Sequence, residues 1–246
     1  SLKPSGIICR GPFATWMALR MRDTGLTNKV CFDGRGAYAA EWEEYRVIDD
    51  EALIAQLRPV EEEAVLKANF RLAVSHALVD HWRERHGYAG NEHVVVPCTL
   101  AQGFLEPLPQ NGVKNAGEAS TAVRFVYSGS AAGWQSFDVL SALVDAIMER
   151  ADTTMVFMSP EDVRITELMA RYPGRVKRVW AENTEEVREQ LARSDVGIMV
   201  REDSVTNRVA SPTKFAEYLS CGLRVIISEH LGDLSELVMG NGLGAV

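Results

Sequence analysis

The sequence has no long apolar run and no dense basic block, and these absences exclude several classes of protein. None of its 246 residues belongs to an apolar stretch long enough to span a bilayer, and its start carries no signal-peptide pattern. The formal net charge of -8 argues against a nucleic-acid binder. We therefore expect a cytoplasmic globular protein with no transmembrane segment and no nucleic-acid partner.

Cysteine and histidine are sparse, and neither shows the spacing of a metal site. The cysteines are Cys9, Cys31, Cys98 and Cys221. Because they lie far apart in apolar or small-residue surroundings, we predict reduced thiols in or near the core. His76, His81 and His86 fall at a spacing that spreads them around a helix. No metal site is predicted.

Short apolar segments alternate with segments of helical periodicity in the first part of the chain. Strands are predicted at 6–10, 29–32, 71–75 and 93–97, and helices at 15–22, 49–57, 61–68 and 76–86. Pro59 is expected to separate the second helix from the third. This alternation indicates a parallel sheet with right-handed crossovers.

Proline, glycine and asparagine cluster at 99–121, as in a loop or linker. We place a domain boundary there, between residues 110 and 111. A second series of strands and helices begins after it, with a strand at 123–128 and a helix from about 134 to 151. The chain is predicted to form two domains, 1–110 and 111–246.

Two turns follow predicted strands at positions where a ligand could approach. Asp33 and Arg35 lie in the Asp-Gly-Arg-Gly turn at 33–36, and ligand crevices of open α/β sheets lie at the carboxyl ends of strands. The alternative is a structural turn in which Asp33 and Arg35 pair with each other or with backbone. The second turn is a small-residue loop made of Ser128, Gly129 and Ser130. Its backbone amides could bind phosphates; the alternative is a loop with a purely structural role.

The segment from Arg208 to Ile227 predicts a loop, a helix and a buried strand. Ser211 is a suitable N-cap, Pro212 suits the first helical position, and Gly222 is placed to end the helix. Free amides at the helix start, the cation of Lys214 and the carboxylate of Glu217 together suit a phosphorylated ligand with hydroxyl groups. A nucleotide sugar fits; a capped helix with a surface Lys and Glu is the alternative.

Residues 211–226, SPTKFAEYLSCGLRVI, resemble the donor-site segment of retaining GT-B glycosyltransferases of family 4. The resemblance is strong from Tyr127 to Val238 and loose before Gly112. It implies two Rossmann-like α/β domains, doubly wound with mostly parallel sheets, facing a cleft. Residues 1–110 would be a partial acceptor-side domain and 111–246 the nucleotide-sugar domain. The first domain has too few strand–helix units, so we expect a chain truncated at both ends or a shortened member.

The resemblance also implies roles for individual residues. Lys214 and Arg201 would be catalytic and stabilise the diphosphate, Glu217 would hold ribose hydroxyls, and the region from Trp180 to Glu182 would seat the base. The full donor-binding set is Ser128, Gly129, Ser130, Trp180, Glu182, Arg208, Ser211, Pro212, Thr213 and Glu217. The acceptor would lie near Arg10, Asp33 and Arg35.

This sequence departs from the family pattern at two places. Many members carry a second Glu where this chain has Val209, and that Glu touches the transferred sugar. Members also often place Arg and Lys in the loop after the first donor-domain strand, whereas this chain has neither between Tyr127 and Met148. The charge is then expected from Arg201, Arg208 and Lys214.

The resemblance implies transfer of a sugar from a nucleotide-diphosphate donor to a carbohydrate or lipid-linked acceptor, as in polysaccharide biosynthesis. It implies retention at the anomeric carbon, no metal ion and no cofactor beyond the nucleotide-sugar co-substrate. A lipid acceptor would bring the protein to a membrane surface. Two alternatives stay open: a nucleotide-sugar epimerase of the same architecture, and a non-catalytic nucleotide-sugar binder.

Overall fold

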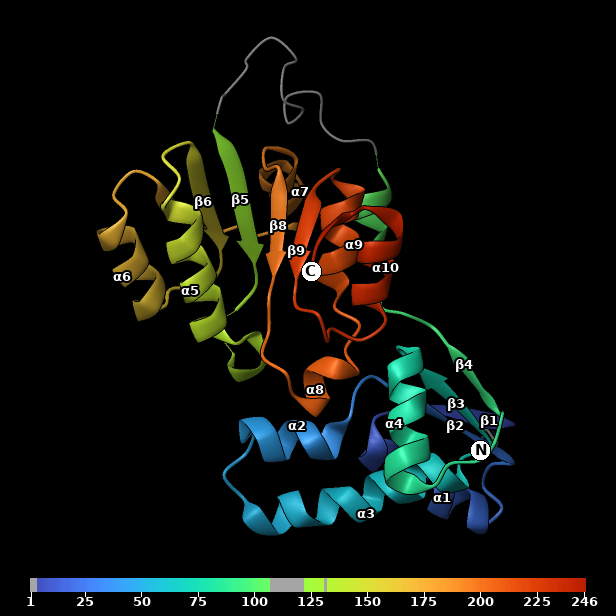
Figure 1. Ribbon diagram of the computed structural model, residues 1–246. Helices are drawn as coiled ribbons and strands as arrows, with labels where there is room; N and C mark the ends of the chain where they lie inside the picture. The colour runs from blue at the N-terminus through green and yellow to red at the C-terminus, as the bar shows by residue number, and fades with distance from the viewer. Residues whose placement is uncertain (1–3, 107–121, 131) are drawn as a thin grey trace. The chain divides into compact units, whose positions relative to one another are not determined.

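The computed structural model describes residues 4–106, 122–130 and 132–246. Its contacts divide the chain into two compact units (Figure 1). The first unit comprises residues 1–98, 203–211 and 230–233, and the second comprises residues 99–202, 212–229 and 234–246. The boundary predicted between residues 110 and 111 lies outside the described residues, so that division stays a prediction.

The first unit contains a parallel sheet whose strands follow chain order. The strands are β1 (Gly6–Arg10), β2 (Lys29–Gly34), β3 (Phe70–Ala73) and β4 (His93–Val95). The helices are α1 (Pro12–Asp23), α2 (Tyr38–Tyr45), α3 (Glu51–Lys67), α4 (His76–His86) and α8 (Val205–Arg208). Right-handed crossovers between sequential neighbours place the connecting helices on one face of the sheet.

The two faces of this sheet are covered to different extents. Val30 and Phe32 in β2 are fully buried against the helices. Ile8 in β1 is 71% exposed and Phe70 in β3 is 40% exposed, because alternate residues of a strand point to opposite faces. The described part of the first unit therefore leaves an apolar sheet face open to solvent, which is unusual for a parallel sheet.

The region around Pro59 differs from the prediction of two helices. The structure has one helix, α3, with Pro59 inside it and Asp50 as its N-cap. Asp50 accepts a hydrogen bond of 3.0 Å from the backbone N–H of Leu53, as expected for a cap. Leu57 and Glu61 on either side of the proline are both buried. Packing on both sides keeps the helix continuous despite the missing amide.

The second unit contains a six-stranded parallel sheet of order β10-β9-β8-β5-β6-β7 (Figure 1). The strands are β5 (Val123–Ser128), β6 (Thr153–Met158), β7 (Val176–Val179), β8 (Val196–Met199), β9 (Arg224–Ile227) and β10 (Gly244–Ala245). Counted from β5, this is the doubly wound order 3-2-1-4-5-6. The direction of winding reverses between β5 and β8. The predicted Rossmann-like fold is confirmed.

Helices of the second unit bury an apolar core against this sheet. The helices are α5 (Phe137–Met148), α6 (Val163–Arg171), α7 (Thr184–Ala192), α9 (Thr213–Ser220) and α10 (Leu234–Asn241). Leu140 and Val144 of α5 pack with Phe157 of β6 and Ile165 of α6. In Figure 1, α5 and α6 lie together beside β5 and β6. No helix in the described part of the chain is both long and apolar enough to cross a membrane.

The ends of α9 test the predicted capping residues. The prediction that Ser211 caps the helix is wrong: α9 begins at Thr213, Pro212 occupies the N-cap position, and no side chain caps it. The Ser211 hydroxyl instead accepts a hydrogen bond from a backbone N–H in the first unit. Gly222 ends the helix as predicted, with φ +79°. Its N–H donates to Leu219 O, and the next N–H donates to Tyr218 O, a Schellman motif.

Candidate functional site

The reversal of winding between β5 and β8 identifies one place in the second unit for a ligand. In open α/β sheets, ligands bind at the carboxyl ends of the strands where the winding direction changes. The loop 128–130 leaves β5 at this edge, and Arg201 follows β8 there. The topology thus brings two predicted donor-binding segments to the same edge, although they are far apart in sequence.

Lys214, in the first turn of α9, reaches the loop after β5. Its Nζ donates a 3.1 Å hydrogen bond to Gln135 Oε1 and lies 4.9 Å from the centre of the Tyr127 ring. Gly129 has φ +155°, and a Cβ at this position would overlap Lys214 Nζ. Glycine is therefore needed at 129 for the ammonium group to lie against the loop backbone. The structure thus brings Lys214 against the loop after β5.

Burial, a second cation and one carboxylate set the electrostatics around Lys214. Burial, followed by repulsion from Arg201, lowers the pKa of Lys214 to about 7. Arg201 itself is only 7% exposed. Glu217 partly opposes this shift, and burial raises the pKa of Glu217 in turn. An anion placed beside Lys214 and Arg201 would favour the charged form of the lysine and offset the cost of burying two cations together.

Tyr218 of α9 fixes the backbone at the point where the winding reverses. Its hydroxyl donates to Ile198 O at 3.2 Å and accepts from the Ser128 N–H at 2.9 Å, so it joins β8 to the end of β5. Its ring occupies space that a Cβ at Gly197 would take. The sequence analysis did not identify Tyr218, although an aromatic residue one turn after Lys214 is a visible signal.

Further hydrogen bonds hold the loops on which the predicted residues lie. The Tyr127 hydroxyl donates to Ser130 O at 2.7 Å. The Ser228 hydroxyl accepts from the Arg201 N–H at 2.7 Å and donates to Arg201 O at 2.6 Å. The Ser136 hydroxyl accepts from the backbone N–H that follows Arg201, also within the second unit. These contacts preorganise both loops, and sequence reasoning missed Gln135, Ser136 and Ser228.

The residues predicted to seat a base lie further along the same sheet edge. Ser128 pairs with Met158, which pairs with Val179, so Trp180 lies two strands from the loop, roughly 10 Å away. Trp180 is 60% exposed and, with Arg178, lines an open cavity of about 410 Å³. Glu182 is exposed just before α7. An exposed aromatic ring beside a cation at this edge is suited to stacking on a flat ring.

The predicted acceptor-side residues lie together at the carboxyl ends of β1 and β2 in the first unit. Arg10 Nε is 3.2 Å from Asp33 Oδ2, and Arg35 Nη1 is 3.6 Å from Asp33 Oδ1. Arg35 also lies 3.1 Å from the Cys98 sulfur. The alternative of an Asp33–Arg35 pair is therefore observed. Arg10 is exposed, so this cluster still offers a cation to solvent.

Two predicted donor-binding residues, Arg208 and Ser211, belong to the first unit. Pro212, Thr213 and Lys214 belong to the second. Arg208 forms a two-pronged ion pair with Asp203, at 2.5 and 2.6 Å. The Ser211 hydroxyl accepts from the Cys98 N–H at 3.1 Å. Both side chains are thus engaged within the first unit.

The cysteines and histidines of the described ranges show how far metal-binding or disulfide chemistry is possible here. All four cysteines are free thiols, as predicted. No described group of three or more His, Cys, Asp or Glu side chains is placed to hold a metal ion. One expectation about the histidines is wrong: His81 and His86 do converge, with ring centroids 5.9 Å apart. Both project from α4 toward the same cavity.

No family model matches the chain, and no curated protein matches its sequence. Several solved structures do match. A sucrose-phosphate synthase from Thermosynechococcus elongatus has a TM-score of 0.66 and 14% identity, covering 95% of this chain and 58% of that one. Anabaena HepE in complex with UDP-glucose has a TM-score of 0.63 and 14% identity, covering 95% and 62%.

A trehalose-phosphate synthase from Burkholderia xenovorans in complex with glucose-6-phosphate has a TM-score of 0.67 and 10% identity, covering 100% of this chain and 63% of that one. The fold is that of the GT-B glycosyltransferases. At these identities the likeness concerns the fold. The chain spans 58% to 63% of the length of these GT-B proteins.

Proposed function

We propose that this protein transfers a sugar from a nucleotide-diphosphate sugar to an acceptor hydroxyl. The observation that carries the proposal is that two cations, Lys214 and Arg201, lie close enough to repel each other where the winding reverses between β5 and β8. Two poorly solvated cations, the amides at the start of α9 and a glycine loop converge there in the second unit. This combination suits a diphosphate, which accepts several hydrogen bonds and carries negative charge.

Sugar transfer requires stabilisation of the leaving diphosphate. As the bond from the anomeric carbon to the diphosphate oxygen breaks, the electron pair stays on the diphosphate while the acceptor oxygen bonds to the carbon. Lys214 and Arg201 would stabilise the growing negative charge, with Ser130, Pro212 and Thr213 beside the phosphates. Preorganised charges of this kind lower a barrier without reorganising during the reaction.

The other roles follow from the resemblance. Glu217 would accept hydrogen bonds from the ribose hydroxyls, and Trp180 would stack on the base. Arg10, Asp33 and Arg35 would contact the acceptor, a carbohydrate or lipid-linked molecule. We propose retention at the anomeric carbon, no metal ion and no further cofactor. The ligands bound in two of the structural neighbours, UDP-glucose and glucose-6-phosphate, support this class of donor and acceptor.

Lys214→Ala tests the proposal. We expect transfer to fall by roughly two orders of magnitude or more, the usual loss when a group that stabilises transition-state charge is removed. The donor class is first found by thermal shift with UDP, GDP, ADP, CMP and dTDP, since a ligand of the native state raises its melting temperature. Turnover is then measured by release of the nucleoside diphosphate.

Lys177→Ala is the matched control, because Lys177 is an exposed lysine on β7 of the same unit. It should leave both the thermal shift and turnover unchanged. Full turnover in Lys214→Ala would refute the assignment. Product NMR reports retention through the anomeric coupling, and EDTA treatment tests independence from metal.

One observation favours a second candidate function, non-catalytic binding of a nucleotide sugar. Val209 stands where many family members carry the Glu that touches the transferred sugar. The Val209 side chain is buried in the apolar core of the first unit, and its carbonyl accepts from the Ser75 hydroxyl at 2.7 Å. This position therefore supplies no polar side chain. Diphosphate binding without turnover on a broad acceptor panel would favour this candidate.

A further inference from the structure

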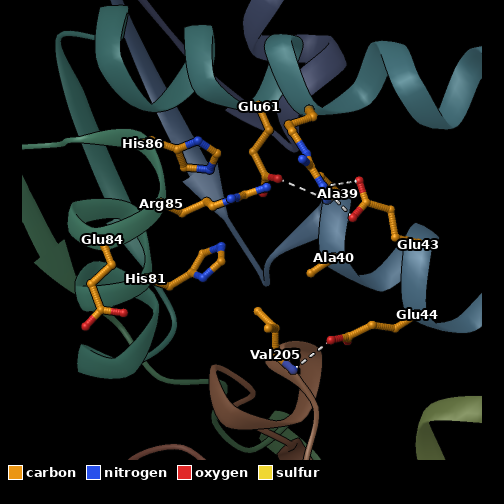
Figure 2. A pocket seen from close by; sticks show the side chains of 11 residues that line it. Ala39, Ala40, Glu43, Glu44, Glu61, His81, Glu84, Arg85, His86 and Val205 are labelled. Carbon is orange, nitrogen blue, oxygen red and sulfur yellow. Dashed lines mark hydrogen bonds and ion pairs between the residues drawn. The ribbon is translucent and has the colours of Figure 1, made fainter.

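We propose that the first unit contains a second ligand site, a cavity that binds a small anion such as a carboxylate or phosphate monoester. The cavity has a volume of about 330 Å³ and is lined by α2, α3, α4 and the start of α8 (Figure 2). All of its lining residues belong to the first unit. It is independent of the lysine site proposed for the nucleotide sugar.

Three hydrogen-bond donors enter this cavity from one helix. His81, Arg85 and His86 of α4 point toward its centre in Figure 2. His86 is only 8% exposed, and its Nε2 has no hydrogen-bond partner among the described residues. Figure 2 shows no hydrogen bond or ion pair from Arg85 to the other residues drawn. A buried polar atom without a partner is costly, so His86 Nε2 favours a ligand that reaches it, and the half-buried His81 and the exposed Arg85 add donors beside it.

The buried carboxylate across the cavity already has its donors. Glu61 of α3 is 1% exposed. Its Oε1 accepts from the Tyr38 N–H and its Oε2 from the Ala39 N–H, both at 2.9 Å. These amides are at the start of α2, where a carboxylate interacts favourably with the helix dipole. Glu61 is therefore engaged with α2.

The two carboxylates of α2 that line the cavity are also engaged. Glu43 holds Arg58 of α3, with both oxygens 2.6 Å from Nη2. Glu44 accepts from the backbone N–H groups of Val205 and Thr206 at 2.8 and 3.0 Å, at the start of α8. The remaining carboxylate, Glu84, is exposed at the cavity's rim. The acceptors of α2 and α3 that face the cavity are thus satisfied within the first unit, whereas His86 Nε2 of α4 has no partner among the described residues, and this difference favours an anion.

The electrostatics support this preference. Burial, followed by repulsion from His81, Arg85 and Arg58, lowers the pKa of His86 to about 4. Burial raises the pKa of Glu61 to about 7, opposed by its two backbone hydrogen bonds. An anion beside the imidazoles would favour their charged forms and raise their pKa values. Because falling pH neutralises Glu61, and because an imidazole beside a bound anion takes up a proton more readily than a free one, the affinity for an anion should rise as the pH falls.

The groups that face the cavity come from three helices. They are Glu43 and Glu44 of α2, Arg58 and Glu61 of α3, and His81, Glu84, Arg85 and His86 of α4, while α8 contributes the apolar Val205. Of these, the imidazoles and Glu61 have pKa values that depart from their ordinary ones in the direction of lower charge. Proton uptake on binding is therefore expected at several positions together.

Calorimetric titration with citrate and with inorganic phosphate tests the site, with glucose as the neutral control. The full chain carries Lys214→Ala so that the nucleotide site does not capture the probe. We expect saturable binding of at least one anion, roughly tenfold tighter at about pH 6 than at about pH 8, and no binding of glucose. Arg85→Gln and His81→Gln should each weaken binding by about tenfold or more, as expected for a lost charged hydrogen bond.

Arg83→Gln is the matched control, because Arg83 is an exposed arginine of α4 that pairs with Asp80 outside the cavity. It should leave the affinity unchanged. Both test substitutions are at residues that are not fully buried, and circular dichroism checks their folding. NMR titration of the histidine ring protons should show the pKa of His86 rising when citrate or phosphate is bound. Absence of binding, an equal loss in Arg83→Gln, or an unmoved His86 pKa would overturn the proposal.

Discussion

At the scale of single residues, the second unit depends on close approaches that only glycine allows. Gly129 admits the ammonium group of Lys214, and Gly197 admits the ring of Tyr218. Each glycine faces a side chain of α9, so the helix lies close to β8 and to the loop after β5. The loss of one of these glycines would move the proposed cation site as a whole.

Gly129→Ala is the prediction at this scale. The added methyl group must displace Lys214 Nζ, so we expect diphosphate affinity to fall about tenfold or more. Gly174→Ala is the matched control: Gly174 also has positive φ, at +76°, but a Cβ there meets no atom within 4 Å. Both variants carry the cost of an alanine at positive φ, and only Gly129→Ala should lose affinity in a thermal-shift titration. Equal losses would refute the role of the close approach.

At the scale of elements, the first unit has a sheet that is packed on one face only. β1 and β2 pair in parallel with Ile8 opposite Cys31, and these residues point away from the helices. Val30 and Phe32 point toward them and are fully buried. The hydrophobic contribution to stability should therefore differ strongly between neighbouring positions of the same strands.

Val30→Ala and Ile8→Ala make a paired prediction. Val30→Ala leaves a cavity in the packed face and should lower the free energy of unfolding by about 2 kcal/mol. Ile8→Ala removes a side chain that is 71% exposed and should change it by less than about 0.5 kcal/mol. Urea denaturation followed by circular dichroism measures both. A comparable loss for Ile8→Ala would contradict the prediction and show that the open face is covered in solution.

At the scale of the whole molecule, the chain does not divide into units at a single point. Residues 203–211 and 230–233 lie in the carboxyl-terminal part of the sequence but pack in the first unit. Asp233 illustrates the consequence, because its carboxylate accepts from the backbone N–H groups of His76 and Ala77 at 2.7 and 3.0 Å. It thereby satisfies two amides at the start of α4 and interacts favourably with the helix dipole.

Asp233→Ala should destabilise the first unit although the residue is distant in sequence. We expect a loss of about 1 kcal/mol, typical of a removed helix cap. Hydrogen exchange should accelerate at the amides of His76 and Ala77. Glu236→Ala, at an exposed position of α10 in the second unit, is the control and should leave these amides protected. Unchanged exchange in Asp233→Ala would contradict the prediction.

The alternating pattern of the sequence determined the α/β class, and local chemistry determined several element boundaries. Strand and helix periodicities need no knowledge of neighbours. For the same reason Gly222 was identifiable as a helix stop, since a cap acts on the nearest turn. The SPTKFAEYLSCGLRVI segment likewise indicated the GT-B fold before any packing was known.

Only the tertiary structure decided how distant segments meet. Packing on both sides of Pro59 kept one helix where local propensity predicted two. The hydroxyl of Ser211 went to a backbone amide in the first unit instead of capping α9. Lys214 lies against Gly129 because the strand order and helix packing bring α9 beside the loop after β5. Local preferences act over one or two turns of chain, whereas these contacts depend on which strands become neighbours and which faces are buried.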